Sequence, residues 1–543
     1  DGRNFIEWRG IPFGKAPVGP LRFASPLPFG KWEGIRDGSK FGGRCPEVSG
    51  FGIDLGDEDC LNLNVSVPKV YTHQLLPVMV YFHGGIFQYG TGSTHRPDYF
   101  MDEDVVYVNP NYRLGVLGFL NTGDTVIRGN MGLKDQVLAL RWVKENIQSF
   151  GGDPNNITIF GESAGGASVH YLTLLPSTQG IFSKAIVQSG IATAFWACLS
   201  TKEAVRFARK YAKRFNCDTE ESSKLVECLR SKTVAELLEE YEDETGPGIL
   251  IRPDLEYTPF LPSIEGVNDE EAFLVEHPLR ILADGRAHGV PMMIGANADE
   301  GLLSSIALYN SEEMADNFEK NCVCHICRAF NIPEDTPNGK ELASKIKEIY
   351  FPENSNLTKD QTLEQFTKLF TDAYFMLHVS HCISVQSQFS PVYPYYFSRR
   401  GGPSFTNQLN LLTNKGNMRV KIAKYLATSL YNRITGNKPT DYGVCHADDL
   451  AMLFNLKFVF HVPWNPNSPD YNFSKDMVKL WVDFARDETS MTFRGVEFSK
   501  QEPGKPLQYL ELCENPKVID EPFGERVEAL KTLGLLELYL SLV

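Results

Sequence analysis

The chain has 543 residues, of which 42% are hydrophobic and 22% charged, and 68 acidic against 53 basic side chains give it a net charge of −15. This composition is typical of a folded globular protein and excludes a disordered or fibrous one. The acidic surface disfavours nucleic-acid phosphates and anionic lipids, and no apolar run approaches the ~18 to 20 residues of a membrane span, so we expect a neutral or cationic small-molecule partner.

Residues 78–190 alternate between short apolar runs and helical patterns. Strands are predicted at Val78–His83, Val105–Asn109, Ile157–Phe160 and Lys184–Gln188, and helices at Leu133–Phe150 and directly after Ser163. This order predicts a largely parallel sheet covered by helices on both faces.

Beyond Gly190 helical patterns predominate, as is typical of insertions that cap a sheet. The predicted helices are Lys202–Phe215, Ser231–Tyr241, Ser474–Asp487 and Glu525–Leu540, and the predicted strands are Pro291–Ala296 and Val392–Phe397. No internal repeat and no linker rich in Pro, Gly or Ser divides the chain. We therefore predict one α/β domain, residues 1–543, with helical insertions after the core strands.

The pentapeptide Gly161-Glu162-Ser163-Ala164-Gly165 has the G-x-S-x-G pattern of a nucleophile elbow. It follows the predicted strand 157–160 and leads into a helical stretch, which is the context that such an elbow requires. The two glycines let strand and helix approach closely, so that the serine hydroxyl projects from a sharp turn. The pattern alone is common by chance, and its context is what favours Ser163 as a nucleophile.

A second turn, His83-Gly84-Gly85-Ile86, directly follows the predicted strand 78–82. Hydrolases with a nucleophile elbow place a glycine-rich turn at this position to bind an oxyanion. The backbone N–H groups of Gly85, Ile86 and Ala164 would then supply three donors. The alternative interpretation is a simple turn that ends in two glycines.

The candidate base is His446, which lies in the turn-like segment 443–448 late in the chain. In this fold the nucleophile precedes the acid and the acid precedes the histidine, and His170 is excluded because it lies on the helix that leaves the elbow. Asp299 and Glu300 follow the predicted strand 291–296, where ligand-facing residues of open sheets cluster. Spacing alone does not separate these two acids.

Further motifs extend nearly from end to end of the chain: Trp8–Phe13 with Pro17–Phe23, Glu58–Val65, Asn111–Gly115, Phe150–Pro154 and Gln188–Gly190. With the serine pentapeptide they resemble the type-B carboxylesterase/lipase family, the cholinesterase-like branch of the α/β-hydrolases, and the glutamate before the serine is most similar to insect carboxylesterases. The resemblance implies an α/β-hydrolase fold, with a mostly parallel central sheet flanked by helices on both faces. It also implies a triad of Ser163, Glu300 and His446, because the family's acid is the glutamate directly before the glycine, and it implies no cofactor.

The resemblance further implies two disulfides, Cys45–Cys60 and Cys217–Cys228, and two structural ion pairs, Arg22–Glu58 and Arg113–Asp135. Asn356 and Asn472 head sequons among polar residues and are candidate glycosylation sites, whereas Asn64 and Asn156 lie in apolar, strand-like runs. Disulfides and sequons together predict a secreted protein or one of the secretory pathway. Because the start, Asp1–Gly10, is neither a signal peptide nor a methionine start, we expect a mature or trimmed form.

Two features depart from the family. Ile86 stands where relatives have glycine or alanine, and Trp196, which resembles an acyl-pocket aromatic of the family, would form the opposing wall of a narrowed acyl pocket. The loop between Cys45 and Cys60 holds no tryptophan, which cholinesterases use there to bind choline, so acetylcholine is not an expected substrate. The cluster of Cys322, Cys324, His325 and Cys327 is too crowded in sequence to wrap a tetrahedral zinc, so we expect no metal site.

These observations predict a serine hydrolase that cleaves small-molecule carboxylic esters through an acyl-enzyme intermediate. One alternative is a non-catalytic, cholinesterase-like binding protein. Another is a protein that sequesters esters or organophosphates and differs from an enzyme only in its slow turnover. The presence of Ser163, Glu300 and His446 together favours the enzyme.

Overall fold

The computed structural model describes residues 2–49, 52–69, 74–217, 219–245, 259–352, 357–413, 440–456 and 468–542, together with residues 424, 427, 428, 431 and 435. A ten-stranded sheet forms its centre, in the order β1-β4-β6-β5-β7-β8-β9-β10-β13-β14. The strands are β1 (Phe5–Pro12), β4 (Asn62–Pro68), β5 (Leu76–Phe82), β6 (Val106–Pro110), β7 (Gly152–Glu162), β8 (Lys184–Gln188), β9 (Met292–Asn297), β10 (Val392–Phe397), β13 (Gln508–Leu512) and β14 (Lys517–Asp520).

The middle of the sheet is parallel, from β6 to β13, and the pairs β1·β4, β4·β6 and β13·β14 are antiparallel. Two small hairpins lie outside it, β2 (Glu47–Ser49) with β3 (Gly52–Asp54) and β11 (Thr492–Phe493) with β12 (Val496–Glu497). In a parallel sheet the carboxyl ends of neighbouring strands share one edge, which is where open α/β sheets bind their ligands.

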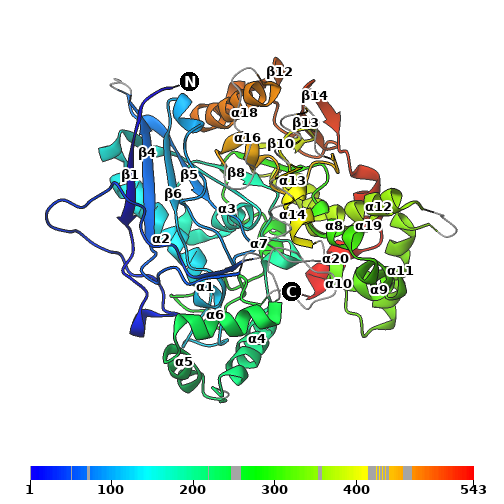
Figure 1. The fold of residues 1–543 in the computed structure, drawn as a ribbon, viewed down its shortest axis with the longest axis horizontal. Helices are drawn as coiled ribbons and strands as arrows, with labels where there is room; N and C mark the ends of the chain where they lie inside the picture. The colour runs from blue at the N-terminus through cyan, green and yellow to red at the C-terminus, as the bar shows by residue number, and fades with distance from the viewer. Residues whose placement is uncertain are drawn as a thin grey trace.

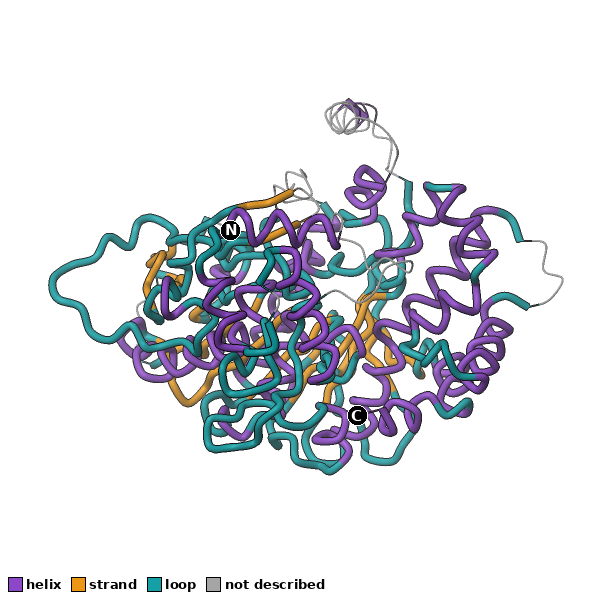
Figure 2. Tube along the Cα trace, turned by 90° about the horizontal axis from the view of Figure 1, so that it is seen from below, coloured by secondary structure: helices purple, strands orange, loops and turns teal. Residues whose placement is uncertain are grey.

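Helices follow the strands and cover both faces of the sheet (Figure 1). They are α1 (Gly115–Phe119), α2 (Met131–Asn146), α3 (Ala164–Leu174), α4 (Thr201–Arg214), α5 (Ser222–Arg230), α6 (Val234–Thr245), α7 (Pro278–Ala283), α8 (Leu302–Asn310), α9 (Glu312–Lys320), α10 (Cys322–Ala329), α11 (Pro337–Tyr350), α12 (Lys359–Thr371), α13 (Leu377–Gln386), α14 (Thr406–Thr413), α16 (Leu450–Leu453), α18 (Pro469–Arg486), α19 (Gly524–Thr532) and α20 (Leu535–Leu542). Helices α9 to α12 gather at the end of the molecule away from β1 (Figure 1). Most strands run through the interior between helices and loops (Figure 2).

The alternation of side chains along each central strand explains why both faces need cover. In β5, Val78, Val80 and Phe82 belong to a core cluster that includes residues of α2 and α3, whereas Met79 and Tyr81 belong to a second cluster with α16 and α18. Because both faces of these strands are buried, successive residues along them are all apolar. The central strands can therefore be predicted from continuous apolar runs in the sequence.

The predicted central strands and helices are present, with ends shifted by a few residues, but one predicted helix is two. Residues 525–540 form α19 and α20, because Gly534 between them has a φ of 80°, outside the helical region. The helix predicted at Ser231–Tyr241 begins later, at Val234, because Thr233 Oγ1 accepts a hydrogen bond from the Glu236 N–H at 3.2 Å and caps it. The sequence does not predict the outer strands β1, β13 and β14, whereas β4 coincides with the strand-like run around Asn64.

Candidate active site

Ser163 lies at the turn between β7 and α3 with φ 59° and ψ −124°, a left-handed φ that side chains other than glycine rarely adopt. The flanking glycines permit this turn. A Cβ on Gly165 would lie 2.0 Å from the Phe82 carbonyl oxygen, and one on Gly161 would lie 2.6 Å from the backbone of Gly165. The N–H of Ser163 donates to the Gln188 carbonyl at 2.9 Å, which ties the elbow to the next strand, β8.

His446 and Glu300 meet beside this turn, although 146 residues separate them. The imidazole Nδ1 lies 2.6 Å from Glu300 Oε2, and both residues are buried. The second oxygen of Glu300 accepts hydrogen bonds from Ser189 Oγ at 2.5 Å and from the Asn297 N–H at 2.7 Å. Three donors thus hold the Glu300 carboxylate in one orientation.

Asp299, the other candidate acid, makes different contacts. Its Oδ2 accepts a hydrogen bond from the Val444 N–H at 2.9 Å and faces the exposed Arg400. It therefore fastens the segment that carries His446 without contacting the imidazole, and Glu300 rather than Asp299 lies against His446.

A buried polar layer beneath these residues fixes the turn around His446. Asn297 Nδ2 donates to the Cys445 carbonyl at 2.8 Å, and Gln188 Nε2 donates to Asp449 Oδ2 at 2.7 Å. Burial raises the pKa of Asp449 to about 6, the Gln188 hydrogen bond acting in the opposite direction. Sequence reasoning did not identify Asp449 or Ser189, although Ser189 stands in one of the motifs.

Glu162, the residue before Ser163, brings a second carboxylate to His446. Its Oε1 lies 3.1 Å from His446 Nε2, without the alignment of a hydrogen bond, and only 3% of the residue is exposed. Burial raises the pKa of this carboxyl to about 8. Burial alone would lower the pKa of His446, but Glu162 and Glu300 together raise it to about 9. The protonated form of His446 is therefore favoured over the neutral form, because the imidazole lies between the carboxyl groups of Glu162 and Glu300.

The turn after β5 lies against Ser163. A Cβ on Gly84 would be 3.0 Å from Ser163 Cβ, so only glycine leaves this space open. Gly85 and Ile86 both have positive φ, 109° and 53°, and a β-branched residue in that region is strained. Within the described part of the chain, the N–H groups of these two residues donate to no backbone carbonyl outside the regular elements.

An aromatic layer lies beside His446. The ring of Phe375 is 4.8 Å from the imidazole and 6.1 Å from Trp196, whose Nε1 donates to the Tyr374 carbonyl at 2.8 Å. Phe375 belongs to the π-helical turn η6 (Asp372–Met376) between α12 and α13, and π turns occur frequently at functional sites. Sequence reasoning identified Trp196 but missed Phe375, because nothing in the local pattern marks a π turn.

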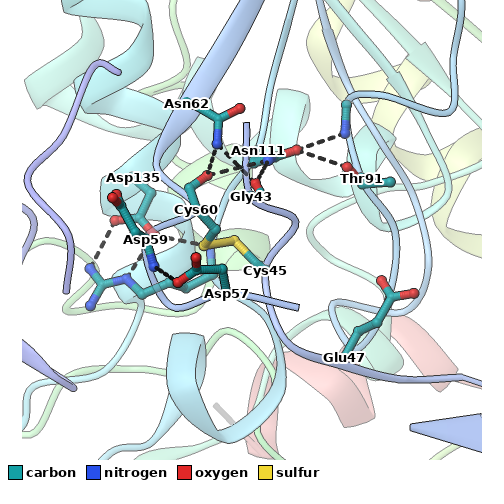
Figure 3. The surroundings of a disulfide bond; sticks show 12 residues. Gly43, Cys45, Glu47, Asp57, Asp59, Cys60, Asn62, Thr91, Asn111 and Asp135 are labelled. Carbon is teal, nitrogen blue, oxygen red and sulfur yellow. Dashed lines mark hydrogen bonds and ion pairs between the residues drawn. A yellow bond between two sulfur atoms is a disulfide. The ribbon is translucent and has the colours of Figure 1, made fainter. Parts of the chain in front are cut away.

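Both disulfides implied by the resemblance are present, with S–S distances of 2.02 Å for Cys45–Cys60 and 2.03 Å for Cys217–Cys228. Figure 3 shows the first, where the side-chain amides of Asn62 and Asn111 each donate to the Gly43 carbonyl at 2.9 Å. Arg113 pairs with Asp135 through two 2.8 Å contacts, and Arg22 pairs with Glu58 at 2.7 and 2.6 Å. The remaining cysteines are free thiols, Cys198, Cys322, Cys324, Cys327, Cys382, Cys445 and Cys513.

The predicted glycosylation sites, and the absence of a metal site expected from the sequence, concern residues other than Ser163, Glu300 and His446. Asn472 is exposed near the start of α18, and Asn356 lies outside the described residues. Asn64 is buried in β4, where its Nδ2 donates to Asn109 Oδ1 at 3.1 Å. Across the described ranges, no three His, Cys, Asp or Glu side chains group as metal ligands and no helix is long and apolar enough to cross a bilayer.

A sequence model described as the carboxylesterase family matches residues 1–530. The chain belongs to this carboxylesterase family. The chain is 34% identical to venom carboxylesterase-6 of Apis mellifera over 466 residues, 83% of this chain and 77% of that protein. It is 34% identical to a juvenile hormone esterase of Tribolium castaneum over 502 residues, 89% and 80% of the two chains. The solved juvenile hormone esterase of Manduca sexta, 23% identical, superimposes with a TM-score of 0.81 over 98% of this chain and 96% of that one.

These comparisons confirm the resemblance and the fold class predicted from the motifs. The protein has the α/β-hydrolase fold, with its largely parallel sheet flanked by helices, and its relatives include insect carboxylesterases. As a member of this family, the carboxylesterase is a carboxylic ester hydrolase.

Proposed function

We propose that the carboxylesterase cleaves small-molecule esters through an acyl-enzyme on Ser163, with His446 as general base and Glu300 as its supporting acid. The observation that carries this proposal is the buried 2.6 Å contact between Glu300 and His446 beside the strained turn of Ser163. A carboxylate in that position holds the imidazole in one tautomer and stabilises its protonated form.

Each step has a group to perform it. His446 takes the proton of the Ser163 hydroxyl as the serine oxygen attacks the ester carbonyl, and the N–H groups of Gly85, Ile86 and Ala164 stabilise the oxyanion. His446 then returns the proton to the departing alcohol. Water, activated by the same histidine, hydrolyses the acyl-enzyme and releases the acid. All of these steps use the chain's own side chains and backbone.

A burst experiment tests this mechanism. Mixing the carboxylesterase with a nitrophenyl ester should release one equivalent of nitrophenol rapidly, followed by steady turnover, and peptide mass spectrometry of quenched enzyme should find the acyl group on Ser163. A non-catalytic binding protein would give no burst of nitrophenol and no acyl group on Ser163. The comparisons do not favour this alternative. A sequestering protein would give a normal burst and then a very slow second step.

We also propose that Glu162 sets the pH dependence of the base. General-base catalysis needs neutral His446, so a raised imidazole pKa causes activity to fall as the pH drops through that value. Removing the Glu162 charge weakens the protonated form and lowers that pKa. The acid limb of the kcat/KM profile of Glu162→Gln should therefore move to lower pH, by on the order of one unit.

The measurement is kcat/KM for nitrophenyl acetate across a pH range of about 5 to 11, which extends above the raised pKa of His446. Glu348→Gln, a matched change at an exposed position of α11, should leave the profile in place. An acid limb that stays put, or that moves to higher pH, in Glu162→Gln contradicts the role of Glu162.

Ile86 is proposed to narrow the acyl side of the pocket, opposite Trp196. Ile86→Gly opens volume and removes a strained side chain at φ 53°, while the backbone donor remains. The ratio of kcat/KM for long-acyl to acetyl nitrophenyl esters should rise several-fold, by about 1 to 2 kcal/mol of discrimination. Ile86→Ala is the second variant. It also opens volume, but because alanine retains a Cβ it does not give the backbone the added freedom of glycine. If the ratio of kcat/KM for long-acyl to acetyl esters is unchanged in both variants, Ile86 does not narrow the acyl side of the pocket.

The carboxylesterase is further proposed to belong to the secretory pathway. Disulfides persist in oxidising compartments, and two are present here. If Asn472 is glycosylated, as its sequon predicts, enzymatic deglycosylation of protein secreted from insect cells should leave a deamidated residue at that position. If the peptide that contains Asn472 is found without deamidation in the secreted, deglycosylated protein, Asn472 is not glycosylated.

A further inference from the structure

Residues 83–90, the oxyanion turn, follow β5 and form a closed loop. The Gly85 carbonyl accepts hydrogen bonds from the N–H groups of Gln88 at 2.8 Å and of Tyr89 at 3.1 Å. The peptide bond after Gly85 is trans, and in a trans peptide the C=O and N–H point in opposite directions. The bonds that fix the Gly85 carbonyl therefore also fix the direction of the Ile86 N–H, one of the proposed oxyanion donors.

The end of the oxyanion turn packs directly on its beginning. A Cβ on Gly85 would lie 2.0 Å from the Tyr89 carbonyl oxygen. A Cβ on Gly90 would lie 2.4 Å from His83 Nδ1 and 2.8 Å from the Gly84 carbonyl oxygen. These backbone contacts leave no free space between the two ends. A displacement of Gly90 would therefore also displace Gly84 and Gly85.

Glu47 holds Gly90 from outside the turn. It lies in β2, two residues after Cys45 and near the Cys45–Cys60 disulfide (Figure 3), and its Oε2 accepts a hydrogen bond from the Gly90 N–H at 2.6 Å. Only 8% of Glu47 is exposed, and a hydrogen bond to a carboxylate is stronger than one between neutral groups. Burial raises the pKa of the Glu47 carboxyl, and the Gly90 N–H acts against that rise. The carboxylate thus joins the oxyanion turn to the disulfide-bonded loop.

We propose that Glu47 is a positioning residue for the oxyanion turn. By holding Gly90 in place, it keeps the N–H groups of Gly85 and Ile86 directed at the oxygen that becomes negative during ester cleavage. This role rests on the proposed acyl-transfer mechanism. Such donors act chiefly on the transition state, so their displacement lowers the rate more than it weakens the binding of a neutral ligand.

Two variants of Glu47 test the role of its acceptor oxygen. Glu47→Met has a side chain of similar length that offers no carboxylate, and it should lower kcat/KM for nitrophenyl acetate by about tenfold. Glu47→Gln retains an oxygen that can accept the Gly90 N–H, and it should recover most of that loss. Equal values of kcat/KM in the two variants would contradict the proposed contact.

A pair of inhibitors separates positioning from a general loosening of the fold. Ser163 adds to the carbonyl carbon of an alkyl trifluoromethyl ketone as His446 takes the serine proton, and the carbonyl electron pair moves to the oxygen, which becomes an oxyanion. The corresponding secondary alcohol has no carbonyl and forms no oxyanion. In Glu47→Met the inhibition constant of the ketone should rise by about tenfold while that of the alcohol changes by less than about twofold. Equal weakening of both inhibitors, or unchanged inhibition by the ketone, overturns the proposal.

Asp57→Ala is the matched control in the same disulfide-bonded loop. The Asp57 carboxylate is exposed and accepts the Asp59 N–H at 2.8 Å, so its loss should leave kcat/KM and both inhibition constants unchanged. A selective loss of ketone binding in this variant as well would overturn the assignment to Glu47.

If Glu47→Met does not fold, Glu47→Asp takes its place. Aspartate keeps the charge but is one methylene shorter, and it should raise the inhibition constant of the ketone more than that of the alcohol. The wild-type protein tells the two proposals apart. Absence of both the nitrophenol burst and ketone binding in the wild type would overturn the acyl-transfer mechanism itself, whereas a normal burst with no selective effect of Glu47 overturns only the positioning role.

Discussion

Replacing Ser163 with alanine should reduce kcat for nitrophenyl ester hydrolysis by about 10⁴- to 10⁶-fold and leave the fold intact. The hydroxyl is the attacking group in the proposed mechanism, and no neighbouring side chain can replace it. Alanine meets the same backbone constraint at φ 59° as serine, so the turn between β7 and α3 should persist. Steady-state kinetics and a thermal unfolding curve measure the two parts of this expectation.

The matched control is Ser168→Ala, on the same helix as the elbow. Ser168 Oγ donates to the Ala164 carbonyl at 2.8 Å and accepts from Gln136 Nε2 at 3.0 Å, so its loss should cost about 1 kcal/mol of stability and little activity. If Ser163→Ala retains more than about one part in a thousand of the wild-type turnover, another nucleophile must be at work.

Glu300→Gln should cost about 10³- to 10⁴-fold in kcat, whereas Asp299→Asn should cost less than about tenfold. Glutamine removes the charge that stabilises the His446 imidazolium 2.6 Å away, and it also disturbs the donors Ser189 and Asn297 that now point at a carboxylate. Asparagine at 299 retains an oxygen that can accept the Val444 N–H.

The comparison between the two variants decides which residue is the acid. The kcat of both variants is measured with the same nitrophenyl ester, at a pH above the acid limb of the wild-type profile. At that pH a shift in the pKa of His446 does not by itself lower kcat. A larger loss in Asp299→Asn than in Glu300→Gln would move the acid to Asp299.

Glu162 illustrates what local sequence cannot convey. The residue is plain in the pentapeptide around Ser163, but its contact with His446 Nε2 joins positions nearly 300 residues apart and arises only when β7 and the segment after β10 are packed together. The raised pKa of the carboxyl has the same origin, because desolvation depends on what surrounds a group and not on its neighbours in the chain.

By itself, the sequence determined the features that depend on short-range chemistry. Continuous apolar runs predicted the central strands, the glycines around Ser163 predicted a turn that admits no Cβ, and the motifs identified the family. Spacing left Asp299 and Glu300 equivalent, and only the resemblance chose between them. The tertiary structure decided what depends on convergence: the contact of Glu300 with His446 and the π turn that brings Phe375 to the imidazole. Packing of distant segments sets these contacts, and no local pattern of residue types encodes them.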